Sequence, residues 1–515
     1  MRPHVQGSGP VEHADVTESG GRLVLIVVAV MAASLMQTLD STITNVALPT
    51  IQGNLGASQD EGTWVVTAYV IAAIVIIPLT PWLQDRFGRR NYFVGSIVGF
   101  TLASVACGAS ESLTFLITSR VVQGAFGGGL LATAQAILRD SFPPAKLGVS
   151  QGIFALGAII GPTLGPPLGG VLVDNASWNW VFDINIVPGI FASIVLLALL
   201  RDPAPARSTA VDFVGLGLLA AGLGSLQYVL TEGERHYWLA DPIVATMTVV
   251  CVLSLAAFGW YELYGTNVPV VDLRIFRNRS VAAGSLLALA LGGVVFGSTY
   301  ALPQLTQGVL GFTPTLSGEL FIVRAVPIAL LTPLIVQLAG KVDTRWLLGI
   351  GFVAVAAGSA LQGLATTSES AFWTFGPSLI LTGAGSGMLF VPISIAVLGA
   401  TTPQEGPKAG AMVNLSLQLG GSIAVAALDV VLDRRWALHS QLLTADATLS
   451  NPNVHDALAR GLSVPALAET INAQAAVLAY ADATFAIALL AAAATPLVFM
   501  MRKPKAPAGP VEAAA

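Results

Sequence analysis

The chain has 515 residues, of which 54% are hydrophobic and 10% are charged, and its mean hydropathy is +0.75. Soluble domains carry about 25% charged residues and lack apolar stretches of about twenty residues, so this composition excludes a water-soluble fold. The net charge of −5 carries little information, because the location of Lys and Arg, rather than their balance, sets orientation in a membrane.

After a polar tail of residues 1–21, fourteen apolar runs are long enough to cross about 30 Å of hydrocarbon. The runs fall near 23–49, 63–83, 91–109, 113–138, 149–173, 180–200, 211–230, 241–263, 280–303, 318–339, 346–366, 374–400, 409–432 and 478–501. With alternate connections taken as cytosolic, eighteen of the 24 Lys and Arg residues lie inside and four outside. Because positive charge gathers on the cytosolic side, we expect an all-α polytopic membrane protein with 14 transmembrane helices and both termini in the cytosol.

Charged connecting segments divide the fourteen apolar runs into a group of six, a pair and a second group of six. We expect an N-terminal six-helix bundle over 22–201, two linker helices with their loops over 202–278, a C-terminal six-helix bundle over 279–501 and a cytosolic tail over 502–515. The outside segment 433–477 is much longer than the other outside loops and has stretches of helical character. It is either a docking surface for a partner or a variable loop.

The sequence argues against enzymatic and metal chemistry. Cys107 and Cys251 fall in apolar runs, and all five histidines lie outside such runs, so we expect no metal site, no cofactor and no enzyme active site. The chain has no G-x-x-x-x-G-K-[ST] loop, which excludes direct ATP drive by this polypeptide. An ion gradient is then the expected energy source, and no nucleic-acid partner is expected.

A polar stripe follows the first apolar run. Asp40 lies seventeen residues after Leu23, where a carboxylate costs on the order of 2.5 to 3.5 kcal/mol on insertion scales. The stripe has i, i+3, i+4, i+7, i+8 spacing and consists of Gln37, Asp40, Ser41, Thr44 and Asn45. These side chains share one helical face, which we expect to line a wet cavity, with Asp40 as the proton carrier. The alternative is a structural charge near the outer interface.

Arg120 lies in the fourth run, with Gln123 on the same helical face. Arginine stays charged under essentially all conditions, so Arg120 needs a carboxylate or a polar cavity beside it, and Asp40 is the candidate. A nearby cation and desolvation act in opposite directions on the acidity of a carboxyl group. A conformational change could therefore load or release a proton. The alternative is an interfacial anchor.

Two further motifs indicate conformational roles. The cytosolic turn after the second run combines an acid, three bases and a glycine: Asp85, Arg86, Gly88, Arg89 and Arg90. Such a turn can lock helix ends through charge and dipole contacts; a short basic loop that only enforces topology is the alternative. The fifth run carries a glycine ridge with prolines in register: Gly157, Gly161, Pro162, Gly165, Pro166, Gly169 and Gly170. The ridge lets another helix approach closely, and its prolines permit bending.

The chain resembles the fourteen-helix drug:proton antiporter branch of the major facilitator superfamily, of EmrB/QacA type. The resemblance rests on Leu39-Asp-Ser-Thr-Ile-Thr-Asn-Val-Ala-Leu-Pro49, Gly62-Thr-Trp-Val65, Asp85-Arg-Phe-Gly-Arg-Arg90, Arg120-Val-Val-Gln-Gly124, Gly161-Pro-Thr-Leu-Gly-Pro-Pro-Leu-Gly-Gly170 and Leu302-Pro-Gln-Leu305. It implies the major facilitator fold and proton-driven export by alternating access. In EmrB-like members, export continues through a periplasmic adaptor and an outer-membrane channel, so 433–477 is a candidate adaptor contact.

The sequence departs from this family pattern at several positions. Pro81 replaces the usual glycine at the start of the cytosolic motif, Asp183 stands where an apolar or aromatic residue is usual, and Leu417 replaces a frequent Arg. Glu319 and Arg324 add charges near the outer end of the tenth helix. They are about 140° apart around a helix, so they need not pair with each other.

We therefore expect a multi-pass protein of the bacterial inner membrane that exports amphipathic small molecules in exchange for protons, with Asp40 and Arg120 as the coupling pair. Candidate pathway residues are Gln37, Thr44, Asn45, Gln123, Asn414 and Gln418. One alternative keeps the fold and exports a fatty acid, siderophore or lipid. A channel is the other, although no segment resembles a selectivity filter.

Overall fold

The computed structural model describes residues 20–143, 146–201, 212–266, 269, 271–338, 341–402, 405–448, 451–461 and 463–501. The expected tails (apart from residues 20 and 21) and residues 202–211 of the linker lie outside this part of the chain. Within it, every regular element is helical. Thirteen of the described helical stretches are long and apolar enough to cross a membrane. The remaining expected span, 149–173, coincides with a further helix of 29 residues.

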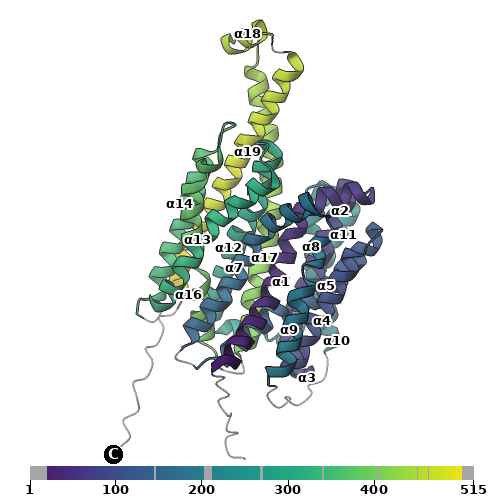
Figure 1. Cartoon of the computed structure of the whole chain (residues 1–515), viewed down its shortest axis with the longest axis vertical. Helices are drawn as coiled ribbons and strands as arrows, with labels where there is room; N and C mark the ends of the chain where they lie inside the picture. Colours follow the sequence, from purple (N-terminus) through teal and green to yellow (C-terminus); the bar gives the residue numbers. More distant parts are fainter. Residues whose placement is uncertain are drawn as a thin grey trace, which may run out of the picture.

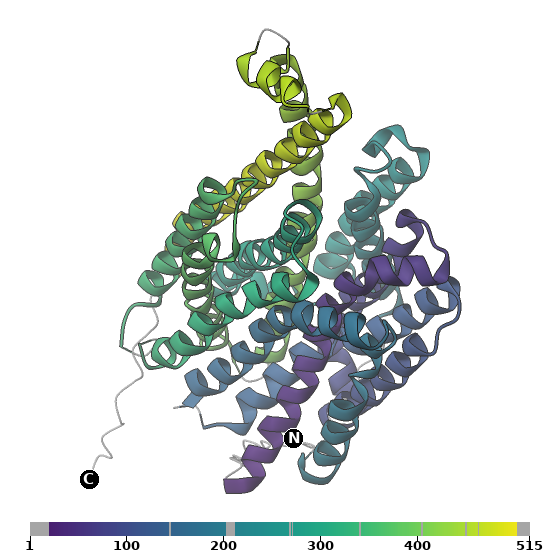
Figure 2. The ribbon, with the colours of Figure 1, turned by 45° about the horizontal axis from the view of Figure 1, so that its top comes forward.

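The helices form two packed groups (Figures 1 and 2). The front helices are α1 (Gly20–Leu55), α2 (Gln59–Ile76), α3 (Thr80–Phe87), α4 (Arg89–Gly108), α5 (Leu113–Gly127), α6 (Leu130–Ser141), α7 (Leu147–Asn175), α8 (Trp180–Asp183) and α9 (Ile186–Leu199). The back helices are α12 (Arg279–Pro303), α13 (Pro314–Leu338), α14 (Thr344–Ala365), α15 (Gly376–Gly387), α16 (Phe390–Leu398), α17 (Gly406–Asp446), α18 (Pro452–Ala459) and α19 (Val464–Ala494). Between them in sequence, α10 (Phe213–Glu232) and α11 (Pro242–Trp260) pack on each other, and α10 also packs on α2. The groups meet where α7 packs along α13.

Several expected spans consist of two helices joined by a short break. Pro78 and Pro81 stand where α2 gives way to a 3-10 turn and then to α3, because proline lacks the backbone donor that would continue the ladder. Gly128 and Gly129 separate α5 from α6, and Ile184 and Asn185 separate α8 from α9. The break before α9 leaves Asn185 at a helix junction inside the molecule, where it is buried.

Both ends of the described chain lie at one end of the molecule. Arg22, at the start of α1, donates through Nη2 to the carbonyl of Leu199 at the end of α9. Arg345, at the start of α14, donates to the carbonyl of Met501. Figure 1 shows the start of α1 at the end opposite α18. This arrangement agrees with both termini being cytosolic.

The segment expected as a long outside loop is mostly helix. α17 has 41 residues and is therefore about 61 Å long, roughly twice the hydrocarbon thickness. Together with α19 it rises beyond the other helices and carries α18 at the tip (Figure 1). Arg435 Nε lies 2.6 Å and His439 Nε2 lies 2.7 Å from Asp482 Oδ2, so the two helices are fastened together where the projection begins.

The glycine ridge of α7 packs against α1. A Cβ atom at Gly161 would lie 1.8 Å from Thr38 Oγ1, and one at Gly165 would lie 2.1 Å from Thr42 Oγ1. The ridge therefore lets the backbones of α1 and α7 approach closely, as in other membrane helix pairs with small residues at the interface. The prolines remain inside one continuous α7.

The Gly165→Ala variant is expected to lose about 1–3 kcal/mol of stability, because the added methyl overpacks the α1–α7 contact. The measurement is the Tm of the purified protein in detergent. Gly95→Ala is the matched control, since a Cβ at Gly95 would meet nothing within 4 Å. Equal Tm values for the two variants would show that the ridge does not govern this contact.

Candidate functional site

The structure brings Asp40 and Arg120 together in the interior of the front helices. Asp40 comes from α1 and Arg120 from α5, and Nη1 of Arg120 lies 2.5 Å from Oδ2 of Asp40. Both side chains have 0% exposure. A charge-assisted hydrogen bond of this length is among the stronger polar contacts in proteins, and here it links two membrane-spanning helices.

Three further side chains complete the surroundings of the carboxylate. Asp40 Oδ1 accepts hydrogen bonds from Gln123 Nε2 at 2.8 Å and Asn185 Nδ2 at 3.0 Å. The same two amides donate to Ser104 Oγ, at 2.7 Å and 3.3 Å. Residues from α1, α4, α5 and the α8–α9 junction therefore converge on one carboxylate. We call Asp40, Ser104, Arg120, Gln123 and Asn185 the acid cluster.

Arg120 is held from the other side as well. Its Nε donates to the Val65 carbonyl of α2 at 2.9 Å, and its Nη1 also donates to Gln123 Oε1 at 2.6 Å. The Cζ atom lies 4.2 Å from the centre of the Tyr69 ring, which places the cation over an aromatic face. Because its contacts come from several helices, the guanidinium cannot leave Asp40 without a rearrangement of the front helices.

The acid cluster differs from the sequence expectation in two respects. The polar stripe of α1 was expected to face a wet cavity, but Gln37, Asp40 and Thr44 are buried. The reason is that side chains of other helices satisfy Asp40, while Thr44 Oγ1 donates to the backbone carbonyl of Asp40 at 3.0 Å. Of the stripe, Asn45 alone is exposed and Ser41 is half-buried. Gln123, expected to line the pathway, instead contacts both members of the buried pair.

Ser104 and Asn185 were not identified from the sequence. Each is a small polar residue within an apolar run, which is common in membrane helices because such side chains bond across helices. An amide at a helix break is a stronger signal, and Pro188 at the start of α9 marks this break, because proline lacks the backbone donor that would continue the helix from α8. The proline does not show toward which helix Asn185 turns, so its contact with Asp40 could not be deduced from the sequence.

A second polar cluster joins the two groups of helices near the cytosolic end. Asn414 of α17 donates through Nδ2 to Gln135 Oε1 of α6 at 3.1 Å. Gln135 Nε2 donates to Gln151 Oε1 of α7 at 2.9 Å and to Ser394 Oγ of α16 at 3.4 Å. All four residues are buried; we call them the amide cluster. Gln418, one turn further along α17, is half-buried.

The cytosolic motif fastens the start of α4 to its neighbours. Gly88, at φ 81°, ends α3, and this left-handed conformation favours glycine. Arg89 forms an ion pair with Asp140 of α6, and Arg90 donates to the carbonyl of Leu197 of α9. Asp85 and Arg86 are exposed on α3.

The unusual charges lie in different surroundings. Asp183 ends α8 and is half-buried beside α4, where a Cβ at Gly108 would come within 2.4 Å of Asp183 Oδ1. Glu319 is exposed on α13. Arg324, expected near the outer end of the tenth helix, is buried ten residues after Pro314, about 15 Å along α13.

A membrane protein with a buried carboxylate–guanidinium pair and a second polar cluster between two groups of helices has the construction of a secondary transporter. Residues 30–425 match the Major Facilitator Superfamily. The chain belongs to this family and is a transporter.

Known proteins similar to the chain agree with this assignment. "Multidrug export protein EmrB" of Escherichia coli (strain K12) is 35% identical over 438 residues, which cover 84% of this chain and 85% of that protein. "Fatty acid resistance protein FarB" of Neisseria gonorrhoeae is 31% identical over 507 residues, which cover 94% and 97%. Among solved structures, the human organic anion transporter MFSD10 (TETRAN) shares the fold with a TM-score of 0.60 at 15% identity, covering 92% of this chain and 100% of that one.

The Asp40→Asn variant is expected to lose about 3–5 kcal/mol of stability, because it leaves the buried cation of Arg120 without its counter-charge. The double variant Asp40→Asn/Arg120→Gln is expected to have a higher Tm than Asp40→Asn alone. For comparison, the exposed pair of Asp456 and Arg460 should show a coupling of only about 0–1 kcal/mol. Additive losses at positions 40 and 120 would contradict an ion pair.

Proposed function

We propose that the protein is a proton-coupled antiporter of the bacterial inner membrane that exports amphipathic small molecules. The observation that carries the proposal is the acid cluster: a carboxylate and a guanidinium at 0% exposure, 2.5 Å apart, on two spans of a Major Facilitator Superfamily transporter. Ionisable groups inside a membrane are costly and mark proton or ion pathways. The name of the EmrB relative supports multidrug export.

In this proposal Asp40 binds and releases the transported proton. In the present conformation its oxygens contact Arg120, Gln123 and Asn185, and the side chain is 0% exposed, so proton exchange requires the front helices to rearrange. Protonation neutralises Asp40 and removes its attraction for Arg120, and this is the event that couples the proton to helix movement. The proton gradient supplies the energy, and no cofactor takes part.

The movement we propose is a rocking of residues 22–201 against residues 279–501, with 202–278 as a linker. In the described conformation the groups are joined by the amide cluster near the cytosolic end and by the hydrogen bond from Arg139 Nη2 to the Leu398 carbonyl at 3.4 Å. Opening toward the cytosol must break these contacts. The ion pair of Arg89 with Asp140 would stabilise the closed state, and the α7 ridge would shape closure.

For the substrate pathway, we retain the candidate polar residues whose side chains, in the described part of the chain, make no hydrogen bond to the Asp40 carboxylate. Gln37 and Thr44 of α1 are buried, Asn45 is exposed, and Asn414 and Gln418 belong to α17. Gln123 is assigned to coupling instead, because its amide contacts Asp40 directly.

Export of a fatty acid is the second candidate, favoured by the similarity to FarB over 94% of the chain. A substrate panel in proteoliposomes, comparing cationic amphipaths with long-chain carboxylates, decides between the two. Flux that persists unchanged after collapse of the pH gradient would indicate a channel.

We also propose that the projecting ends of α17 and α19, with α18, contact a periplasmic adaptor that leads to an outer-membrane channel. The support is structural: the projection is fastened at its base by Asp482 and extends well beyond the expected thickness of the bilayer. A variable loop would need neither feature.

In everted vesicles energised to a fixed pH gradient, addition of substrate should release protons with the wild type but not with Asp40→Asn. Arg120→Ala should insert normally and lose transport, because the charge that tunes Asp40 is gone. Glu111→Gln is the control, since this acid is exposed in the turn between α4 and α5. Unchanged proton release by Asp40→Asn would refute its coupling role.

Replacement of residues 443–470 by a short Gly/Ser linker keeps the Asp482 fastening and removes the projection. This variant should retain transport in proteoliposomes and lose cross-linking to the periplasmic adaptor of the same bacterium. The control keeps residues 443–470 and carries the same linker inserted after Glu111, in the turn between α4 and α5. Undiminished adaptor cross-linking in the shortened variant would place the contact elsewhere.

A further inference from the structure

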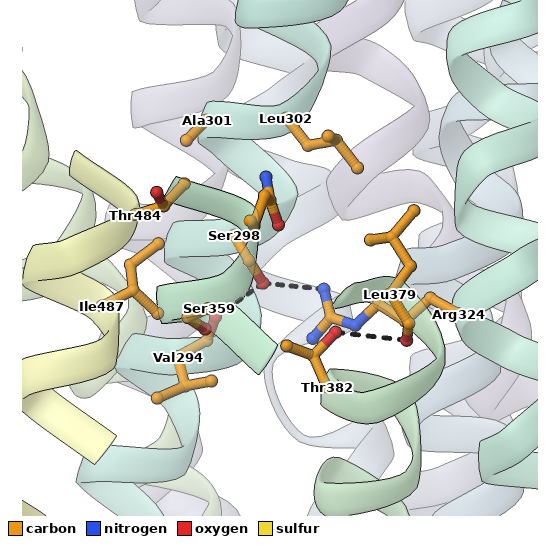
Figure 3. A pocket seen from close by; sticks show the side chains of 11 residues that line it. Val294, Ser298, Ala301, Leu302, Arg324, Ser359, Leu379, Thr382, Thr484 and Ile487 are labelled. Carbon is orange, nitrogen blue, oxygen red and sulfur yellow. Dashed lines mark hydrogen bonds between the residues drawn. The ribbon is translucent and has the colours of Figure 1, made fainter. Parts of the chain in front are cut away.

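Arg324 lines a small cavity inside the back helices (Figure 3). Arg324 comes from α13, and the other walls come from α12, α14, α15 and α19. The side chain is 4% exposed and reaches from α13 toward Ser298 of α12 and Ser359 of α14 (Figure 3). This cavity lies outside the acid cluster and the amide cluster, and the proposed function makes no use of it.

Arg324 differs from Arg120 in having no acid beside it. Among the described residues, no carboxylate oxygen lies within 4.0 Å of its guanidinium. Its Nη1 donates to Ser298 Oγ at 2.7 Å, and its buried Nε has no hydrogen-bond partner. A buried cation that lacks a counter-charge is unfavourable by several kcal/mol, so an anion from outside the chain would stabilise this guanidinium.

The backbone of a neighbouring helix lies directly against the backbone of Arg324. A Cβ at Gly383 of α15 would lie 2.3 Å from the backbone oxygen of Arg324, so the two helices cross in contact at this point. Glu319 is on the same helix, but it is exposed and turned about 140° away. The cation is thus a fixed feature of the packed back helices.

The cavity is lined by neutral polar groups suited to an anion. Besides Ser298, the polar wall consists of Ser359, Gln362, Thr382 and Thr484. The hydroxyls of Thr382 and Thr484 donate to backbone carbonyls at 3.2 Å and 2.8 Å. In the described part of the chain, no side-chain hydrogen bond engages Ser359 or Gln362, so a hydroxyl and an amide remain as donors for a ligand.

The size of the cavity restricts the ligand. Its free volume of ≈ 10 Å³ accommodates about one particle of the size of water. A carboxylate-bearing substrate or a phosphate does not fit in this conformation. A monatomic anion comes nearest to this size. Chloride is larger than water, so its entry displaces the lining side chains slightly and brings it into a charge-assisted contact with Nε of Arg324.

We propose that this cavity binds one small monovalent inorganic anion, chloride under cellular conditions, as the counter-ion of Arg324. The anion neutralises the guanidinium and uses the free donors of Ser359 and Gln362. The back helices then contain an ion site of opposite sign to the proton-binding carboxylate of the front helices. This inference stands independently of the exported substrate.

The test uses the full-length protein purified in detergent, with sodium chloride exchanged for sodium gluconate at constant ionic strength. The wild type should show a higher Tm in chloride and should retain radioactive chloride on a desalting column. Arg324→Met should lose both effects, and Arg460→Gln, an exposed arginine on the projection, should lose neither. Gln362→Leu, which keeps the cation, should bind chloride more weakly.

A wild-type Tm that is the same in chloride and gluconate, with no retained chloride, would overturn the proposal. The cavity would then hold water and no anion. Chloride retention that persists in Arg324→Met would overturn the assigned site. If Arg324→Met does not fold, anomalous scattering from wild-type crystals soaked in bromide decides: a peak beside Arg324 Nε supports the site, and none there refutes it.

Discussion

The contact between Asp40 and Arg120 determines much of the architecture of the front helices. Two opposite charges placed in a bilayer must be brought together, because each alone costs far more than the pair. Their pairing joins α1 to α5. The remaining lone pairs and donors then require Ser104 from α4, Val65 from α2 and Asn185 from the α8–α9 junction. The same contact that holds these helices together is the one a transported proton would break.

The back helices contain no fully buried ion pair among the described residues, and their packing relies on the kind of glycine contact that also joins α1 to α7. Their close contacts depend on glycines, such as Gly292, where a Cβ would lie 1.9 Å from the Leu417 carbonyl of α17. Backbone contact of this kind resists change of shape, since packed interiors move as units. The asymmetry suits the proposed mechanism, in which the front helices rearrange around a titrating acid and the back helices move against them as a body. Firm packing of this kind also holds Arg324 in place, although no acidic side chain of the described chain pairs with it.

Hydropathy predicted the helical fold, because the bilayer sets the length of every span. The distribution of charge predicted that both chain ends lie on the same side of the membrane, because positive residues gather on the cytosolic side. Asp40 and Arg120 stood out for the same reason: each is a charge in a long apolar run. Their partners Ser104 and Asn185 could not be predicted, since a lone polar residue in a membrane helix has many neutral uses. The depth of Arg324 was misjudged because α13 begins at Pro314, outside the apolar run that was expected from 318. Prolines mark the breaks around Pro78 and before α9, but the direction in which the second break turns Asn185 depends on tertiary packing.

The continuity of α17 couples two distant parts of the molecule. One unbroken helix runs from Asn414, in the amide cluster near the cytosolic end, to Asp446 at the projection, a distance of about 48 Å. A stiff rod pivoting within the membrane amplifies small angles, and a tilt of about 10° at the amide cluster displaces the far end by roughly 8 Å. If the back helices rock as proposed, the position of the outer tip changes whenever the cytosolic side opens or closes. A protein bound to that tip would then be displaced once in each transport cycle.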